Sequence, residues 1–146
     1  MNLPNKFEFY VKMGIIKKIS PDNAKAQFLT NASENSLEGL QEVKRKIGIN
    51  DKNANSLVKD AYDIIMGLVR AKLLLNGYKS SGFHSHEAEV SYLYNLKFSD
   101  NDISFLNELR GNRNSAIYYG KILDKEYGEK VVEFLEKVYP KLKKLI

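Results

Sequence analysis

A long apolar helical pattern near the middle of the chain most constrains what it can fold into. Between about residues 53 and 76, apolar side chains recur at helical spacing, and in the second half they surround most of the helix circumference. A helix that is apolar on nearly every side is expected at the centre of a bundle, where other helices cover it. No segment alternates between apolar and polar residues for long enough to predict a β-strand.

Similar patterns predict that the rest of the chain is helical too. Further helices are expected over residues 6–18, 21–47, 85–97, 101–119 and 125–144. The expected fold class is therefore all-α, an antiparallel up-and-down bundle of four to five helices joined by short loops. We expect residues 1–146 to form a single domain, in which the short N-terminal helix over 6–18 precedes a bundle over 21–144.

Several residues mark the expected ends of these helices. Four of them carry side chains that can cap a helix N-terminus: Ser20, Ser85, Ser99 and Asp124. Pro21 suits the first position of a helix, whereas Pro140 is expected to kink or fray the last one. Three glycines stand where helices are expected to stop: Gly48, Gly77 and Gly120.

Composition excludes several classes of protein. The chain has no cysteine, which rules out a disulfide, a thiolate metal site and a cysteine nucleophile. No apolar run approaches the roughly 20 residues of a membrane-spanning helix, and residues 1–6 lack the apolar core of a signal peptide. We therefore expect a cytoplasmic protein without membrane association. The net charge of +5 permits binding to phosphates or to an acidic partner without requiring it.

The segment from Leu109 to Gly120 is the strongest candidate for a functional site. On a helix, five of its side chains fall on one stripe: Arg110, Arg113, Asn114, Ile117 and Tyr118. Toward the N-terminus the same stripe is apolar, with Ile103 and Leu106 expected in the core. Arginine on such a face indicates paired charges, a subunit interface or an anionic ligand.

Two interpretations of this stripe remain open from the residues alone. In the structural one, the arginines pair with Glu108, Asp124 or another carboxylate, and the tyrosines fill the core. In the functional one, Arg110, Arg113 and Tyr119 face phosphate or RNA. Arginine offers several fixed donors to phosphate, and tyrosine can stack on a base.

Other candidate motifs give weaker signals. His84 and His86 are two residues apart, so their rings diverge on a helix, and no third ligand is positioned near them; no metal site is expected. The chain has no phosphate-binding glycine loop and no nucleophile elbow, and no cofactor is expected. The end of the chain is rich in lysine, which is typical of a solvated helix end and less often of a tail that contacts a polyanion: Lys137, Lys141, Lys143 and Lys144.

The hexad Arg113-Asn114-Ser115-Ala116-Ile117-Tyr118 resembles the signature of the HEPN superfamily, which is an arginine, a polar residue, three variable residues and a histidine. The order of helices is similar as well, because the signature belongs near the end of the penultimate main helix of a small bundle. The long helix ending in Ala71–Gly77 and the His86-Glu87-Ala88 start of the next helix fit the same pattern. The resemblance covers about residues 7–138 and implies a small all-helical HEPN domain of archaeal or bacterial type.

The resemblance also implies a site and an activity. In HEPN ribonucleases, the signature arginine and histidine meet at a dimer interface and cleave RNA without metal. Here Arg113 and Asn114 match the first two positions, with Arg110 in support, while Tyr118 stands at the histidine position. Tyrosine has a reference pKa of about 10 and is a poor base at neutral pH, whereas histidine titrates near neutrality. Whether the chain is a metal-independent endoribonuclease is therefore left open.

Three functions follow as hypotheses from this resemblance. The first is an RNA-binding or ribonuclease-type module of a toxin–antitoxin or defence system, working as a homodimer with Arg113, Asn114 and Tyr118 at the cleft between subunits. The second is a non-catalytic HEPN partner of a small nucleotidyltransferase of the MNT type. The third is a purely structural dimeric bundle, in which Arg113 pairs across the interface.

Overall fold

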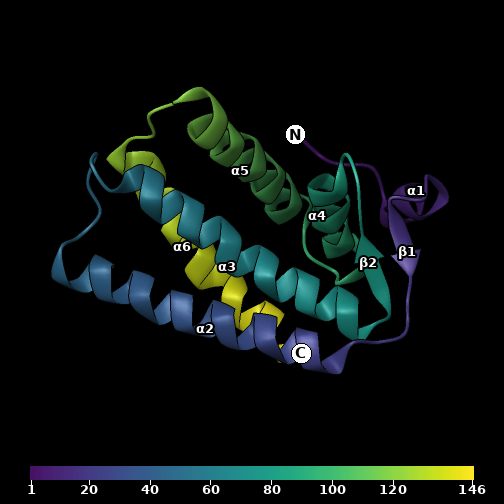
Figure 1. The fold of residues 1–146 in the computed structure, drawn as a ribbon. Helices are drawn as coiled ribbons and strands as arrows, with labels where there is room; N and C mark the ends of the chain where they lie inside the picture. Colours follow the sequence, from purple (N-terminus) through teal and green to yellow (C-terminus); the bar gives the residue numbers. More distant parts are fainter.

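The computed structural model describes residues 1–146 and contains six helices and one small two-stranded sheet (Figure 1). In chain order the elements are α1 (Phe7–Lys12), β1 (Ile16–Lys18), α2 (Asn23–Lys46), α3 (Ala54–Leu75), β2 (Tyr78–Ser80), α4 (Ser85–Asn95), α5 (Asp100–Tyr119) and α6 (Lys125–Lys144). The chain is thus mostly helical, as the sequence predicts. None of the helices combines the length and the apolar character needed to cross a membrane.

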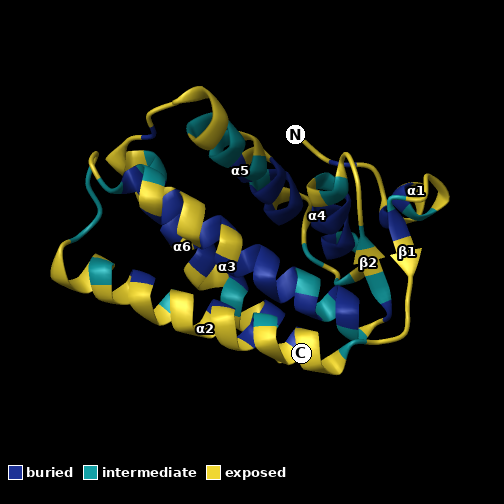
Figure 2. Cartoon of the chain, viewed as in Figure 1, coloured by how far each residue is buried: buried dark blue, intermediate teal, exposed yellow.

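Helix α3 lies at the centre of the molecule. It packs against α2, α6, α4 and α5 (Figure 1), and 14 of its 22 residues are buried; the exposed ones lie in its first half, and none follows Asp63 (Figure 2). The all-round apolar pattern of its second half requires this position, because each exposed leucine or valine would forgo roughly 1.5–3 kcal/mol of burial. The predicted helix over 53–76 and its central place are confirmed.

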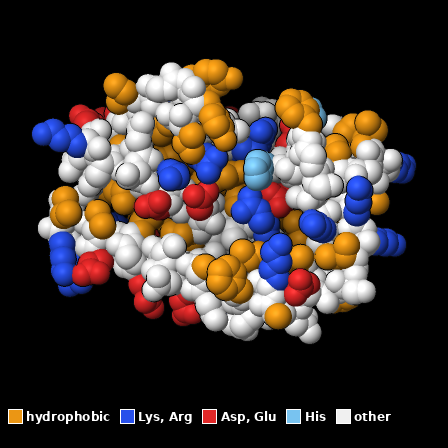
Figure 3. Space-filling model, in the orientation of Figure 1, with side chains coloured by type: hydrophobic (Ala, Val, Ile, Leu, Met, Phe, Trp, Pro, Cys, Tyr) orange, Lys and Arg blue, Asp and Glu red, His pale blue; other side chains and the backbone are white.

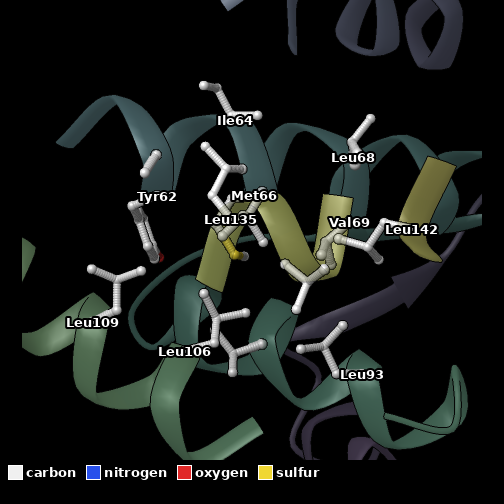
Figure 4. Packing of buried hydrophobic residues seen from close by; sticks show 14 of the residues in the cluster. Tyr62, Ile64, Met66, Leu68, Val69, Leu93, Leu106, Leu109, Leu135 and Leu142 are labelled. Carbon is white, nitrogen blue, oxygen red and sulfur yellow. The ribbon is translucent and has the colours of Figure 1, made fainter. Parts of the chain in front are cut away.

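The core joins α3 to α4, α5 and α6 in one continuous cluster. Figure 4 shows Met66 of α3 close to Leu135 of α6, with Leu106 of α5 beside them. All three side chains are fully buried. At one end of the cluster the ring of Tyr62 extends toward Leu109, so the core reaches the part of α5 that carries the candidate site (Figure 4).

A small sheet replaces part of the predicted N-terminal helix. The prediction of one helix over 6–18 is wrong, because α1 ends at Lys12 and β1 pairs antiparallel with β2, with Ile16 opposite Ser80 and Lys18 opposite Tyr78. Each strand has only three residues, which is too short for an alternating pattern to be recognised. The pairing ties the start of the chain to the connection between α3 and α4 (Figure 1).

Several predicted helix ends are confirmed. The side chains of Ser99 and Asp124 each accept a hydrogen bond from the backbone amide three residues later, so both are N-caps. Gly120 closes α5 in the left-handed conformation, at a φ of 69°, which glycine adopts without steric cost. Pro140 lies inside α6, which nevertheless continues to Lys144.

Two predicted N-caps are wrong. Helix α2 begins at Asn23, and its cap is Asp22 rather than Ser20; the Asp22 carboxylate accepts from the third residue of the helix at 3.0 Å. Pro21 therefore lies before the helix and not at its first position. Ser85 is the first residue of α4, and the residue before it, His84, has a left-handed φ of 67° and makes no side-chain cap.

Candidate functional site

Three ion pairs join α3, α4 and α5 on one face of the molecule. They are Arg113–Asp63, Arg110–Glu87 and Arg70–Glu89, and we call these six side chains the ion-pair row. Figure 3 shows side chains of both charges across the middle of this face, in the region where Figure 1 places these three helices. Each pair bridges two helices, so the row fixes α5 and α4 relative to α3 and to each other.

Arg113 is held more by packing than by its ion pair. Its guanidinium carbon lies 5.4 Å from the centroid of the Tyr62 ring, and its side chain is only 19% exposed. One terminal nitrogen, Nη2, donates to Asp63 Oδ1 at 3.3 Å, and the other, Nη1, reaches Asn114 Oδ1 at 3.4 Å. Both are long hydrogen bonds. Its Nε is buried and has no partner within the chain, so this arginine keeps unused donor capacity.

Arg110 has a similar environment one helical turn earlier. Its Nε donates to Asn107 Oδ1 at 3.1 Å, while its closest contact with Glu87 is 3.7 Å. The other oxygen of Glu87 accepts from the hydroxyl of Tyr10 at 2.9 Å. Burial, together with this hydrogen bond, raises the pKa of Tyr10 to about 12. Tyr10 therefore remains a donor, and Glu87 is closer to Tyr10 than to Arg110.

The ion-pair row modifies the structural interpretation of the stripe. Both arginines do have carboxylate partners, as that interpretation expects, but the partners are Asp63 and Glu87 rather than Glu108 or Asp124. A periodic pattern within one helix cannot identify partners that lie on other helices. The row has three carboxylates for its three arginines, so each arginine lies beside an acid on another helix.

The expectation that the tyrosines of the stripe fill the core is wrong. Tyr118 and Tyr119 are 70% and 86% exposed, and Ile117 is partly exposed as well. The last turn of α5 extends beyond the neighbouring helices, so the stripe leaves the core there. Arg113 Nη1 and Asn114 Oδ1, from neighbouring residues, are 3.4 Å apart, whereas the hydroxyl of Tyr118 makes no hydrogen bond within the chain.

Tyr62 lies beneath the row and was not among the sequence candidates for the site. Its ring is buried, and its hydroxyl has no hydrogen-bond partner. Burial raises its pKa to about 12, although the positive charges of Arg70, Arg110 and Arg113 act in the opposite direction. Tyr62 is thus a neutral donor within electrostatic range of all three arginines. The sequence does not distinguish Tyr62 from any other aromatic core residue of an apolar helix, so it could not be recognised as part of the site.

Arg70, His86 and Glu89 form a third group. Sequence reasoning considered the side chain of His86 only as a metal ligand to be excluded, and it did not identify Arg70 or Glu89 as site residues. Glu89 is buried, and one of its oxygens accepts from Arg70 Nε at 2.9 Å and from Ser80 Oγ at 3.1 Å. His86 Nδ1 lies 3.1 Å from the other oxygen. Burial raises the pKa of Glu89, but the hydrogen bond with His86 and the charge of Arg70 outweigh it and lower the pKa below its usual value. The sequence feature that could have revealed this group is Arg70, a charged residue in the most apolar part of the helix predicted over 53–76.

No group of three or more histidine, aspartate or glutamate side chains is arranged to hold a metal ion.

The lysine-rich end of the chain is partly paired with acids. Lys137 donates to the buried Asp102 at 2.7 Å, and Lys143 lies 3.7 Å from Glu34. Part of the lysine-rich end therefore pairs with acids of α5 and α2.

Comparison with known proteins adds no assignment. The chain matches no protein-family model, no curated protein and no solved structure. The resemblance to the HEPN superfamily consequently depends on the arginine hexad and on the order of the helices, and function has to be inferred from the geometry of the site.

Proposed function

We propose that this chain is an RNA-binding protein with a HEPN-like antiparallel up-and-down bundle, and that it acts as a homodimer in a toxin–antitoxin or defence system. The observation that carries the proposal is the state of Arg113. Its guanidinium is fixed against Tyr62, yet its only carboxylate contact is a long one to the half-exposed side chain of Asp63.

A phosphate group can replace Asp63 at low cost. Ion pairs with exposed carboxylates contribute at most about 1 kcal/mol, because solvent screens them. A phosphate offers Arg113 two acceptors in a geometry that the guanidinium matches. Because the arginine is already ordered, binding loses little side-chain entropy. The same argument applies to Arg110, whose contact with Glu87 is 3.7 Å.

The exposed tyrosines at the end of α5 supply a second kind of contact. Tyr118 and Tyr119 follow Arg113 by one to two turns of the helix and extend into solvent. Stacking of a base on an exposed aromatic ring contributes roughly 1–3 kcal/mol and depends little on sequence. Arginines that hold phosphate and tyrosines that stack on bases together suit single-stranded RNA.

RNA binding tests this proposal directly. We expect Arg113→Ala to weaken binding of a single-stranded RNA about tenfold or more and to reduce the dependence of affinity on salt by about one counterion. Arg45→Ala is the matched control, because Arg45 is exposed on α2 and forms no ion pair. Fluorescence anisotropy at several salt concentrations measures both variants. Equal losses in the two variants would remove the site assignment.

Ribonuclease activity is a separate question that the same variants answer. Assays in the presence of EDTA should compare the wild type with Arg113→Ala and Tyr118→His. Cleavage by the wild type that Arg113→Ala abolishes would make the chain a metal-independent endoribonuclease with tyrosine in place of histidine. Cleavage that appears only in Tyr118→His would support a wild type that binds RNA without cutting it.

The apolar end of α5 favours a second candidate function, in which the chain is a docking partner. Ile117, Tyr118, Tyr119 and Ile122 are exposed together around the turn from α5 to α6, and we call them the α5–α6 patch. Such a cluster fits a protein surface, such as that of a small nucleotidyltransferase of the MNT type or of a second copy in a structural dimer. Co-expression with a nucleotidyltransferase of that type, comparing the wild type with Ile122→Asp, tests this role.

A further inference from the structure

A pocket lies beside the ion-pair row, at the other end of α3 from Arg113. It has a volume of about 270 Å³ and lies among α2, the second half of α3, β2 and the first turns of α4. Neither Arg110 nor Arg113 lines it. Its apolar lining residues are Leu29, Leu73, Leu74 and Tyr78. A concave site with apolar lining residues and a few convergent polar groups is the usual form of a small-molecule site.

The polar part of the pocket is predominantly basic. Lys25, Arg70 and Lys79 line it together with His86, whereas Glu89 is the only carboxylate. That carboxylate is buried and already accepts from Arg70 and from the hydroxyl of Ser80. The two lysines are exposed and form no ion pair, so the pocket has an excess of positive charge that its own residues do not neutralise.

The hydrogen bonds inside the pocket depend on which ring nitrogen of His86 carries the proton. His86 Nδ1 lies 3.1 Å from Glu89 Oε1 and 3.2 Å from Arg70 Nη2. A carboxylate can only accept and a guanidinium can only donate, so Nδ1 can satisfy just one of them. When Nδ1–H donates to Glu89, Arg70 Nη2 has no acceptor within the chain, and an anion in the pocket would supply one.

We propose that this pocket binds a small phosphate monoester with an apolar or aromatic body. The phosphate would accept from Arg70 and lie near Lys25 and Lys79, while the body of the ligand would pack against the partly exposed Leu29 and Tyr78. Glu89 holds Arg70 in place, which lets the guanidinium present its free nitrogens to the ligand. This site goes beyond the proposed RNA-binding role, because it uses different residues and does not depend on that role.

Titration of the full chain with adenosine monophosphate tests the proposal. Isothermal calorimetry should show saturable binding to one site with a Kd of about 1 mM or tighter, and uncharged adenosine should not bind in the same range. In the NMR spectrum, the ring signals of His86 should shift along the same binding curve. An absence of saturable binding would overturn the proposal. Inorganic phosphate that binds as tightly as the nucleotide would overturn the role of the apolar lining residues.

A pair of lysine substitutions locates the site. Lys25→Ala combined with Lys79→Ala removes two exposed charges without breaking any ion pair, so the fold should survive, and binding of adenosine monophosphate should weaken about tenfold. Lys12→Ala is the matched control, because Lys12 is exposed on α1 outside the pocket, and it should leave the Kd unchanged. Equal affinity of the double variant and the Lys12→Ala control for adenosine monophosphate would overturn the assignment of the site to this pocket. Arg113→Ala should not change nucleotide binding, which separates this test from that of RNA binding.

Discussion

Glu89 is a carboxylate that water barely reaches, with a side chain only 6% exposed. Burying an unpaired charge costs several kcal/mol, and here donors from Arg70, Ser80 and His86 replace the lost water. This explains why the pKa of Glu89 is lowered despite its burial, since each of these contacts favours the ionised form. The group connects α3, β2 and α4 through one side chain.

Glu89→Gln should therefore destabilise the fold by about 2 kcal/mol at neutral pH, because Arg70 keeps its charge in a half-buried place without a counterion. The effect should depend on pH. A carboxyl group with a lowered pKa contributes stability above its unfolded pKa of about 4.5 and loses that contribution as pH falls toward the lower folded value. Urea unfolding from pH 7 to pH 3 should show the difference between wild type and variant shrinking below about pH 4.5.

The control for this prediction is Glu42→Gln. Glu42 pairs with Lys46 on the exposed surface of α2, and such pairs contribute less than about 0.5 kcal/mol. Its substitution should change stability little at any pH. A difference in unfolding free energy between wild type and Glu89→Gln that stayed constant down to pH 3 would show that the ionised form of Glu89 does not stabilise the fold.

An interaction can be predicted from the sequence when its two residues lie close together along the chain. The N-caps Ser99 and Asp124 act on a backbone amide three residues away, so their residue type and position are enough to recognise them. The partners of Arg110 and Arg113 are Glu87 and Asp63, which lie 23 and 50 positions away in the chain and on other helices. Only the packing of three helices brings such residues together.

The packing of α2 against α3 depends on one glycine. Gly67 lies where α2 approaches α3 closely, and a Cβ at this position would collide with the side chain of Ser33. The hydroxyl of Ser33 donates to the backbone oxygen of Ile64 at 3.1 Å, so the serine is fixed in place. Both residues are buried. If α2 and α3 moved apart to admit a larger side chain, the two helices would lose core contacts.

Gly67→Ala is expected to destabilise the protein by about 1–3 kcal/mol, the usual cost of overpacking a core. The double variant Gly67→Ala with Ser33→Ala should recover part of that loss, because the colliding hydroxyl is gone. Thermal or urea unfolding of the four proteins forms a double-mutant cycle. Strictly additive effects would show that the two side chains do not collide.

Gly39→Ala should have the opposite effect from Gly67→Ala. Gly39 lies within α2, and a Cβ at this position would meet no atom within 4 Å. Alanine restricts the unfolded chain and suits a helix better than glycine, so a gain of about 0.5–1 kcal/mol is expected. The same unfolding experiments measure it. A loss of stability would mean that the surface of α2 at this position is covered.

The elements themselves show where periodicity is informative. Helix α3 has 22 residues and begins and ends within one or two residues of its predicted bounds, since six turns give a strong 3.6-residue signal. Strands β1 and β2 have three residues each and pair across about 60 positions of chain, so neither carries a detectable pattern alone. Gly14, with a φ of 75°, ends the first helical segment and permits the turn into β1.

Across the whole molecule, exposed apolar surface is distributed unevenly. The α5–α6 patch brings Ile117, Tyr118, Tyr119 and Ile122 together over six positions of chain, whereas Phe28 is a large apolar side chain exposed alone on α2. A single exposed apolar residue needs no explanation, but a cluster indicates a surface that another molecule covers. In the homodimer proposed for this chain, Ile117 and Ile122 of the patch are the natural contact between the two copies, while Tyr118 and Tyr119 stay at its edge, open to RNA beside Arg113.

Ile122→Asp tests this arrangement. Ile122 is 83% exposed in the connection after α5, so an aspartate there should not disturb the fold, but it would place a charge in an apolar dimer contact. Sedimentation at several concentrations should show a dimer for the wild type and a population shifted to monomer for the variant, since such a buried charge costs at least about 2 kcal/mol. Phe28→Asp is the matched control and should leave the dimer intact. Dissociation by both substitutions, or a wild type that is monomeric throughout, would contradict a dimer formed through this patch.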